Sequence, residues 1–356
     1  MLNASRRDAA AVSRQLGPIQ QPLTREPDIV IRFVDSLQTS SRLRLLGLDD
    51  AGFTDDAFMV MHGRNGSRAR VKLALEQIGE RCEITCESGL ERVPLLIPIL
   101  NLTALSKGVL PLHASAFAYG GLGVLTLGWS KGGKTETLLA FMSEGATYIG
   151  DEWVYISADG RLMYGIPQPI RVWDWHLHCL PEYRALLGKS ERVRLGAIKT
   201  FLSIARKMPR WPDSGFARSM ALGRVMPVLE RQLYVDMPPD RLVNGNLGSL
   251  DGAIDRVFFV VSHEQPDVTL KPIEAHEIAR RMVFSLQYER LDFMSYYHKF
   301  RFAFPEARNE FIEQAEDLQR EMLLRVLTGK RAYAVYHPYP VALSALFDAI
   351  RPFVNG

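Results

Sequence analysis

Residues 128–135 read GWSKGGKT and fill every fixed position of the pattern G-x-x-x-x-G-K-[ST]. In this pattern the glycines let backbone N–H groups curl around phosphate oxygens, the lysine reaches the β- and γ-phosphates, and the hydroxyl ligates Mg²⁺. The apolar run at residues 123–127 predicts a buried strand entering this glycine loop. Apolar residues at helical spacing in 135–142 predict a helix leaving it, so bound phosphates would lie at a helix N-terminus.

The remaining chain shows a β-rich beginning and an α/β continuation. Residues 1–25 are polar and are predicted to form a flexible arm, and strand-like runs in 26–93 predict a β-rich N-terminal module with a hairpin turn at Asn65-Gly66. In residues 94–356 strands and helices alternate, which predicts an α/β catalytic domain. One of its amphipathic helices is predicted over residues 274–288.

Composition excludes several classes of partner. A net charge of +3 over 356 residues gives no electrostatic sign of nucleic-acid binding. No apolar run approaches the roughly 18 residues of a membrane-spanning helix, and the N-terminus lacks the apolar core of a secretory signal. We therefore expect a cytoplasmic protein without a membrane partner, while homo-oligomerisation stays open. The three cysteines, Cys82, Cys86 and Cys179, form neither a disulfide framework nor a zinc spacing and are predicted to be reduced thiols.

Two adjacent carboxylates, Asp151 and Glu152, follow a short predicted strand at residues 146–150. An Asp-Glu pair in a turn is usually only solvated. One strand after the helix of a phosphate-binding loop, however, one carboxylate can ligate Mg²⁺ and the other can accept the proton of an attacking hydroxyl. The position of the pair therefore indicates phosphoryl-transfer chemistry.

At this point the sequence resembles a known family. The segments LHAS at residues 112–115, the glycine loop and GDE at residues 150–152 resemble the catalytic half of HPr kinase/phosphorylase and its HPr-kinase-like relatives. Those enzymes share the P-loop architecture of phosphoenolpyruvate carboxykinase. The resemblance runs from about residue 95 to residue 156, and it implies an α/β fold with a mixed sheet that uses ATP and Mg²⁺.

The resemblance also implies roles for residues whose positions match the family. Asp151 matches the general base of the kinase direction, and His113 matches a histidine near the acceptor phosphate, so both are predicted to be catalytic together with Lys134. Thr135 and Glu152 are predicted to ligate Mg²⁺. The predicted nucleotide-binding residues are Gly128, Ser130, Lys131, Gly132, Gly133, Lys134, Thr135 and Glu136.

The chain departs from the family at three places. Lys131 replaces a usual glycine, so we expect Gly132 to take the positive φ and the Lys131 side chain to point toward the mouth of the cleft. Glu152 replaces an aspartate. The Glu-x-Arg-Gly-x-Gly signature that contacts the protein substrate has no counterpart, which disfavours HPr itself as acceptor. Arg171, in the segment that takes its place, is a candidate phosphate or acceptor ligand, or else a surface arginine on a strand.

The sequence thus predicts a Mg²⁺-ATP-dependent kinase that phosphorylates a hydroxyl, with Asp151 as the general base. The acceptor is a peptide serine, a small alcohol or a sugar. The alternative is a nucleotide-binding regulatory or assembly protein with little or no turnover, in which the N-terminal module binds the partner.

Overall fold

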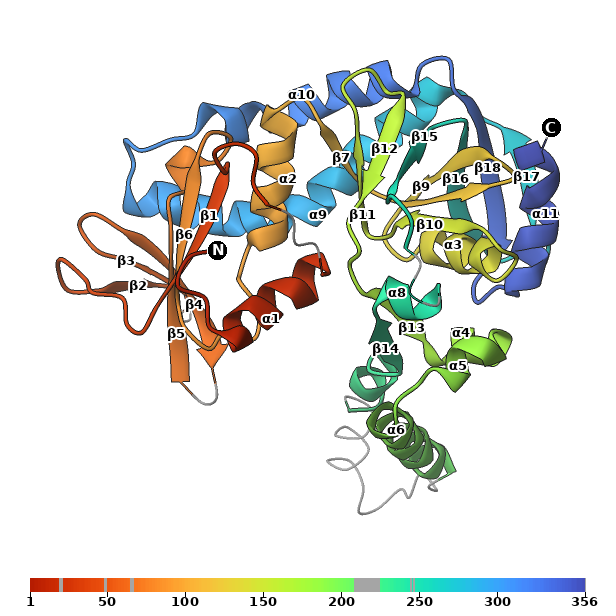
Figure 1. Ribbon diagram of the computed structural model, residues 1–356, viewed down its shortest axis with the longest axis horizontal. Helices are drawn as coiled ribbons and strands as arrows, with labels where there is room; N and C mark the ends of the chain where they lie inside the picture. The colour runs from red at the N-terminus through yellow and green to blue at the C-terminus, as the bar shows by residue number, and fades with distance from the viewer. Residues whose placement is uncertain are drawn as a thin grey trace, which may run out of the picture. The chain divides into compact units, whose positions relative to one another are not determined.

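In the computed structural model, the chain divides into two compact units (Figure 1). The larger unit comprises Met1–Gln168 and Leu247–Gly356, and Pro169–Asn246 forms the smaller unit. The structure describes residues 1–18, 22–47, 50–64, 67–207, 225–243, 245 and 247–355.

The N-terminal part of the larger unit is a six-stranded sheet in the order β1-β6-β5-β4-β3-β2. Strands β1 and β6 are parallel, and all other neighbours are antiparallel. The strands predicted in residues 26–93 are therefore present, whereas the turn at Asn65-Gly66 lies outside the described residues. The six strands are β1 (Ile29–Val34), β2 (Arg44–Leu46), β3 (Ala51–Phe53), β4 (Phe58–Arg64), β5 (Ser67–Leu73) and β6 (Cys82–Glu87).

The segment predicted as an arm contains a helix, α1 (Arg6–Leu16). Ser5 and Asp8 form a reciprocal capping box at its N-terminus, which satisfies backbone N–H groups that the helix leaves unpaired. The Asp8 carboxylate also accepts a bond of 2.7 Å from the Gly89 N–H, just after β6. This contact links α1 to the N-terminal sheet.

The central sheet of the larger unit has the order β10-β8-β9-β16-β18-β17. Strands β9, β16 and β18 run parallel, while β8 is antiparallel to β9 and β17 is antiparallel to β18. The expectation of an α/β fold with a mixed sheet is therefore confirmed. The six strands are β8 (Ser115–Tyr119), β9 (Leu122–Gly128), β10 (Thr147–Gly150), β16 (Arg256–His263), β17 (Thr269–Pro272) and β18 (Arg331–Pro338).

A third, antiparallel sheet has the order β15-β12-β11-β7. Strand β7 continues into β8 through Ala114, and β10 continues into β11 through residues 151–152, so the chain passes between two sheets twice. The candidate residues His113, Asp151 and Glu152 lie at these two crossings. The four strands are β7 (Leu110–His113), β11 (Trp153–Ile156), β12 (Leu162–Gly165) and β15 (Asp251–Ala253).

Helices cover both faces of the central sheet (Figure 1). On β16, Phe258 stacks on Tyr333, which in turn contacts Phe353 of α11. The next residue, Phe259, points to the opposite face and shares a core cluster with Met282 of α9. The helices of this unit are α1, α2 (Leu96–Ser106), α3 (Lys134–Met142), α9 (Ala275–Ala303), α10 (Glu310–Leu327) and α11 (Leu343–Asn355), with the 3₁₀ turn η1 (Leu75–Gln77).

The smaller unit pairs two antiparallel strands and adds short helices to the long helix α6. No helix in the described part of the chain is both long and apolar enough to cross a bilayer. The elements of this unit are β13 (Ile170–Trp173), α4 (Asp174–Cys179), α5 (Pro181–Ala185), α6 (Lys189–Lys207), β14 (Tyr234–Met237) and α8 (Pro239–Leu242).

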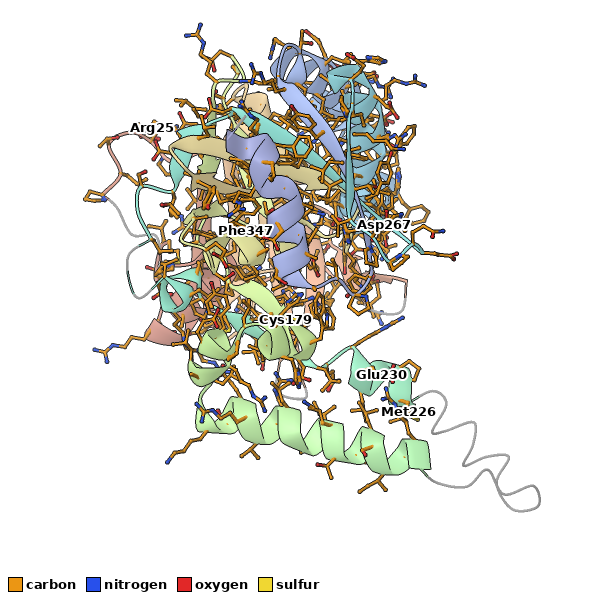
Figure 2. The ribbon with its side chains drawn as sticks, turned by 90° about the vertical axis from the view of Figure 1, so that its right-hand side faces the viewer. Arg25, Cys179, Met226, Glu230, Asp267 and Phe347 are labelled. Atoms are coloured by element: carbon orange, nitrogen blue, oxygen red, sulfur yellow. The ribbon has the colours of Figure 1, made fainter. Side chains whose placement is uncertain are left out.

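The three cysteines are free and differ in accessibility. Cys82 and Cys86 are buried on β6, whereas Cys179 is exposed at the end of α4 (Figure 2). Burial raises the pKa of both β6 thiols to about 12. Because the thiolate is the reactive form, we expect a disulfide-exchange reagent to modify Cys179 alone in the native protein and all three thiols in denaturant. Absorbance of the released thiol measures this, and a fast phase that survives in Cys179→Ser would contradict it.

Candidate nucleotide site

The glycine loop joins β9 to α3, as the sequence predicts. Gly128 ends the strand, and Gly133, at φ 108°, precedes the first residue of the helix. No side chain hydrogen-bonds the N-terminus of α3 at its cap in the structure as described. Helix N-termini leave backbone N–H groups unpaired, and these groups favour anions. The loop therefore presents donors to a bound phosphate.

Within the loop, the prediction for Gly132 is wrong, because Lys131 itself takes the positive φ of 61°. The reason is a local turn in which the Gly132 N–H donates to the Trp129 carbonyl at 3.0 Å. Lys131 is the third residue of that turn, the position that requires positive φ in a type II turn. Its side chain is exposed and lines a pocket beside the loop, in keeping with the expected direction.

Lys134 is held inside the loop. Its ammonium donates to the carbonyls of Trp129 at 2.8 Å and Gly128 at 3.3 Å, and only 5% of the residue is exposed. Burial lowers the pKa of Lys134, while the nearby carboxylates of Glu152 and Asp151 oppose that shift. The positive charge is therefore fixed at the inner side of the loop, where a phosphate would need it.

Asp151 lies against the hydroxyl of Thr135, whose Oγ1 is 3.1 Å from Asp151 Oδ2. The carboxylate is 2% exposed. Burial raises the pKa of Asp151 to about 7, the Glu152 carboxylate adds to the rise, and the Thr135 hydroxyl and the Lys134 charge oppose it. Of the acidic pair, the structure thus brings Asp151 to the predicted Mg²⁺ ligand Thr135.

Glu152 points instead to His113. The imidazole lies between two carboxylates, with Nε2 3.1 Å from Glu152 Oε2 and Nδ1 2.7 Å from Glu289 Oε1. Its ring stacks on Trp153 at 5.7 Å. Burial alone lowers the pKa of His113, but the two glutamates outweigh it and raise the pKa above the usual value. His113, Glu152 and Glu289 form the His113 cluster, and Glu289, on α9, was not predicted from sequence.

Backbone geometry separates the two acidic side chains. Glu152 has φ 64°, and the Trp153 N–H donates to the Asp151 carbonyl at 2.8 Å, which closes a three-residue turn. Such a turn is rare and strained for a residue with a side chain. The Glu152 carbonyl accepts from the Ala114 N–H at 3.2 Å, which holds the two sheet crossings together. Strain of this kind is concentrated at functional sites.

A second unpredicted residue, His337 on β18, contacts the backbone of the glycine loop. It is fully buried, and its Nε2 lies 2.9 Å from the Gly132 carbonyl oxygen. In the sheet register Val335 pairs with Val260, which pairs with Gly128, so His337 lies two residues beyond the level of the loop's first glycine. Ligand sites form beyond the carboxyl ends of parallel strands, and this rule is the sequence signal that would have identified His337.

The contact with His337 predicts a steric cost at Gly133. A Cβ at Gly133 would lie 2.2 Å from His337 Nε2, whereas a Cβ at Gly145, also at positive φ, would meet nothing within 4 Å. Both substitutions to alanine carry backbone strain, but only Gly133→Ala must displace a buried ring. We expect Gly133→Ala to lower the free energy of unfolding by about 1–3 kcal/mol more than Gly145→Ala in urea titrations. Equal losses would mean that His337 moves away freely.

The other predicted residues are distributed between the units. Glu136 is buried in the first turn of α3, where its charge acts on Lys134. Arg171 belongs to the smaller unit, where its Nε lies 3.3 Å from Asp236 Oδ1 and its guanidinium lies over the Tyr234 ring. The described contacts of Arg171 are those of a surface arginine on a strand.

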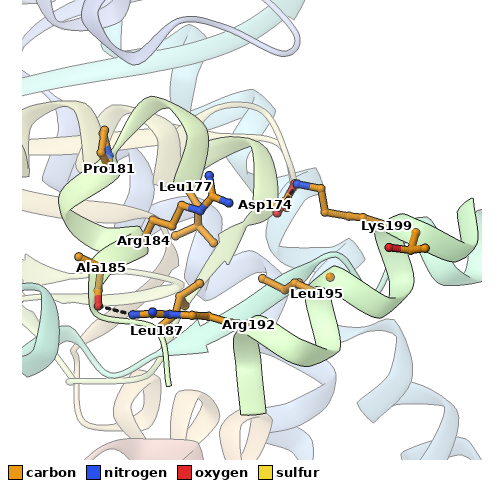
Figure 3. Close-up of a pocket in the computed structure, with 11 residues that line it drawn as sticks. Asp174, Leu177, Pro181, Arg184, Ala185, Leu187, Arg192, Leu195 and Lys199 are labelled. Carbon is orange, nitrogen blue, oxygen red and sulfur yellow. Dashed lines mark hydrogen bonds and ion pairs between the residues drawn. The ribbon is translucent and has the colours of Figure 1, made fainter. Parts of the chain in front are cut away.

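The smaller unit has a pocket of its own, of about 760 Å³, that contains none of the predicted site residues. Lys199 pairs with Asp174 at 2.9 Å, and Arg192 donates to the Ala185 carbonyl at 2.9 Å (Figure 3). Leucines 177, 187 and 195 supply apolar lining. Lys199 and Arg192 are therefore already engaged by partners within the smaller unit.

The residues at Thr135 fit a magnesium ion better than a transition metal. Among the described residues, no group of three or more His, Cys, Asp or Glu side chains is placed to hold a metal. Mg²⁺ does not require one, because it is usually held by one or two carboxylates together with substrate phosphates and water. The Thr135 hydroxyl and the adjacent Asp151 carboxylate supply the hard oxygen ligands that Mg²⁺ prefers.

Comparison of the chain with known protein families finds no family that matches it, and comparison with curated proteins finds no relative.

Proposed function

We propose that the chain is a Mg²⁺-ATP-dependent kinase that transfers a phosphoryl group to a hydroxyl. The observation that carries the proposal is the contact of Asp151 with Thr135 beside the buried Lys134, within a strand–glycine loop–helix arrangement. A phosphate-binding loop needs a lysine for the β- and γ-phosphates and an acid next to its Ser/Thr hydroxyl. Lys134 supplies the first requirement, and Asp151, one strand further along the chain, supplies the second.

In the proposed reaction, an acceptor hydroxyl oxygen attacks the γ-phosphorus of ATP. The bond from that phosphorus to the β,γ-bridging oxygen breaks, ADP leaves, and the hydroxyl proton passes to the Asp151 carboxylate. Lys134 and the loop N–H groups balance the charge on the transferring group. A bound Mg²⁺, held by Thr135 and Glu152, would neutralise further phosphate charge.

The environment of Asp151 suits a general base. A base is most effective when its pKa lies near the working pH, and burial raises the pKa of Asp151 to about 7. Asp151 also lies where a Mg²⁺ ligand is expected, because it contacts Thr135. The assignment of Asp151 as base and Glu152 as metal ligand therefore needs a direct test.

For the finer fold we propose an HPr-kinase-like core. Its support is the mixed central sheet, with His113 just before β8, the glycine loop after β9 and the acidic pair after β10, in the order that the resemblance implies. The Glu-x-Arg-Gly-x-Gly signature that contacts the protein substrate is absent from the sequence. We therefore propose a peptide serine, a small alcohol or a sugar as the acceptor.

The test is transfer from γ-labelled ATP to panels of serine peptides, sugars and small alcohols, with purified full-length chain and Mg²⁺. Label on a hydroxyl product supports the kinase. Tight nucleotide binding without label transfer to any acceptor would favour the alternative, a nucleotide-binding regulatory or assembly protein.

A further inference from the structure

A cavity of about 540 Å³ lies beside the glycine loop, within the larger unit. Its walls come from loop residues Trp129 to Gly132, the carboxyl end of β16 and the first half of α9. Small-molecule sites typically enclose 300–1,000 Å³, with mostly apolar walls and a few placed polar groups. This cavity has both features, and the reaction proposed above assigns it no role.

One polar side chain in the cavity has no partner. Ser285 on α9 lines the cavity and is 2% exposed, yet its hydroxyl makes no hydrogen bond to any described residue. A helical serine usually satisfies its hydroxyl by bonding the carbonyl four residues earlier. A buried hydroxyl without a partner is costly. A ligand that offers a donor or an acceptor at this point would remove that cost.

The remaining walls offer ring faces and two cations, Lys131 and Arg281. Trp129 and Phe284 line the cavity and are 49% and 61% exposed, so their rings are accessible to a ligand. The Arg281 guanidinium lies over the Phe259 ring, 5.6 Å from its centroid, and pairs with Glu277. Ring faces beside one buried hydroxyl match a flat heteroaromatic base with a polar edge.

Helix α9 connects the cavity to the His113 cluster. Ser285 and Glu289 are four residues apart and therefore share one face of α9, about 6 Å apart along its axis. Glu289 contacts His113, but neither His113 nor Asp151 lines the cavity. In the proposed reaction the acceptor hydroxyl must reach Asp151. The cavity, one helical turn away and bounded by the loop itself, therefore suits the unreactive end of the phosphate donor.

We propose that this cavity binds the nucleoside of the nucleotide, with the base against Phe284 and Trp129 and its polar edge on the Ser285 hydroxyl. The inference rests on the proposed function for the glycine loop. It extends that function by placing the base on the α9 side of the loop.

The test compares two ligands that share phosphates and differ in the nucleoside. Calorimetry on the full-length chain measures the Kd for Mg²⁺-ATP and for inorganic tripolyphosphate. Stacking on one aromatic side chain contributes about tenfold or more to binding of a base. We expect Phe284→Ala to raise the Kd for ATP about tenfold and to leave that for tripolyphosphate unchanged. Ser285→Ala should weaken ATP about two- to tenfold, again without effect on tripolyphosphate.

Leu291→Ala is the matched control, because Leu291 is 58% exposed on the same helix and does not line the cavity. It should change neither Kd. An unchanged Kd for ATP in Phe284→Ala overturns the proposal, and so does an equal loss for both ligands, which would indicate a distorted loop. If the wild-type chain binds both ligands and the variants behave as expected, but no label is transferred, this inference stands and the kinase proposal fails. If the wild-type chain binds neither ligand, both proposals fail.

Discussion

Lys134→Ala should reduce phosphoryl transfer by at least about 10²–10³-fold and weaken ATP binding. The ammonium is the only predicted catalytic cation within the loop, and it is held by the carbonyls of Trp129 and Gly128 at a buried position. Removing one preorganised donor from a site that excludes water typically costs this much in kcat. Initial rates with γ-labelled ATP measure the loss of transfer, and calorimetry measures the loss of binding.

The loss should not come from unfolding. Burial lowers the pKa of Lys134, so the charged lysine is less favourable in the folded chain than in the unfolded chain. Lys134→Ala therefore removes a desolvated charge together with two hydrogen bonds, and thermal unfolding should confirm a folded variant. Lys271→Ala is the matched control, because Lys271 is exposed on β17, and it should keep full transfer. Unchanged turnover in Lys134→Ala would remove the glycine loop from catalysis.

The parts of the site that were predicted correctly depend on local signals. The strand before the glycine loop and the helix after it follow from apolar spacing over a few residues on either side. The return of the acidic pair to the loop follows from one further strand, β10, whose carboxyl end lies beside the loop. Short-range patterns and the rule for strand ends were sufficient to bring the pair there, but they did not predict that Asp151, rather than Glu152, would contact Thr135.

Lys131 shows where the local signal was misread. A glycine at position 132 suggested that it would absorb the unusual dihedral, but the hydrogen bond from Gly132 to Trp129 makes Lys131 the third residue of the turn. At Gly132 a side chain would be tightly accommodated, since a Cβ there would lie 3.0 Å from the Trp129 carbonyl oxygen. A turn's hydrogen bond, which sequence does not reveal, decided which residue takes the positive φ.

Glu289 could not be predicted because long-range packing brings it to the site. The apolar pattern predicted a helix over residues 274–288, which stops one residue before it. The helix continues to Ala303, and Phe300 of that continuation packs on Phe58 of the N-terminal sheet at 5.8 Å. Contacts between parts of the chain more than 200 residues apart thus carry the glutamate to His113.

Substitution of the acidic pair should have the second large effect on phosphoryl transfer. The two substitutions should impair transfer in different ways. Asp151→Asn keeps the shape of the side chain and removes the proton acceptor, so kcat should fall about 10²–10⁴-fold with little change in ATP affinity. Glu152→Gln should instead raise the Mg²⁺ concentration required for half-maximal rate, because a neutral amide is a weaker ligand. Rates across a Mg²⁺ titration measure both effects.

Asp151→Asn should also stabilise the chain, which separates loss of chemistry from loss of fold. Burial raises the pKa of Asp151 from its ordinary 3.8 to about 7. Between these values the folded chain binds a proton that the unfolded chain has lost. The stability of the wild type therefore falls as pH rises from about 4 to about 7. Asparagine has no such proton to lose. The variant should unfold at higher urea than the wild type at pH 8, and this advantage should shrink toward pH 4.

The same ionisation predicts the pH profile of transfer. Only the carboxylate form of Asp151 accepts a proton, so wild-type kcat/KM, which reports ionisations of the free enzyme, should fall as pH drops through about 7. The contact of Asp151 with Thr135 supplies the competing assignment, in which Asp151 holds Mg²⁺ and Glu152, next to His113, takes the proton. If added Mg²⁺ rescues Asp151→Asn but not Glu152→Gln, the two roles are exchanged. If neither substitution affects transfer, the acidic pair has no catalytic role and the nucleotide-binding regulator becomes the better interpretation of the same site.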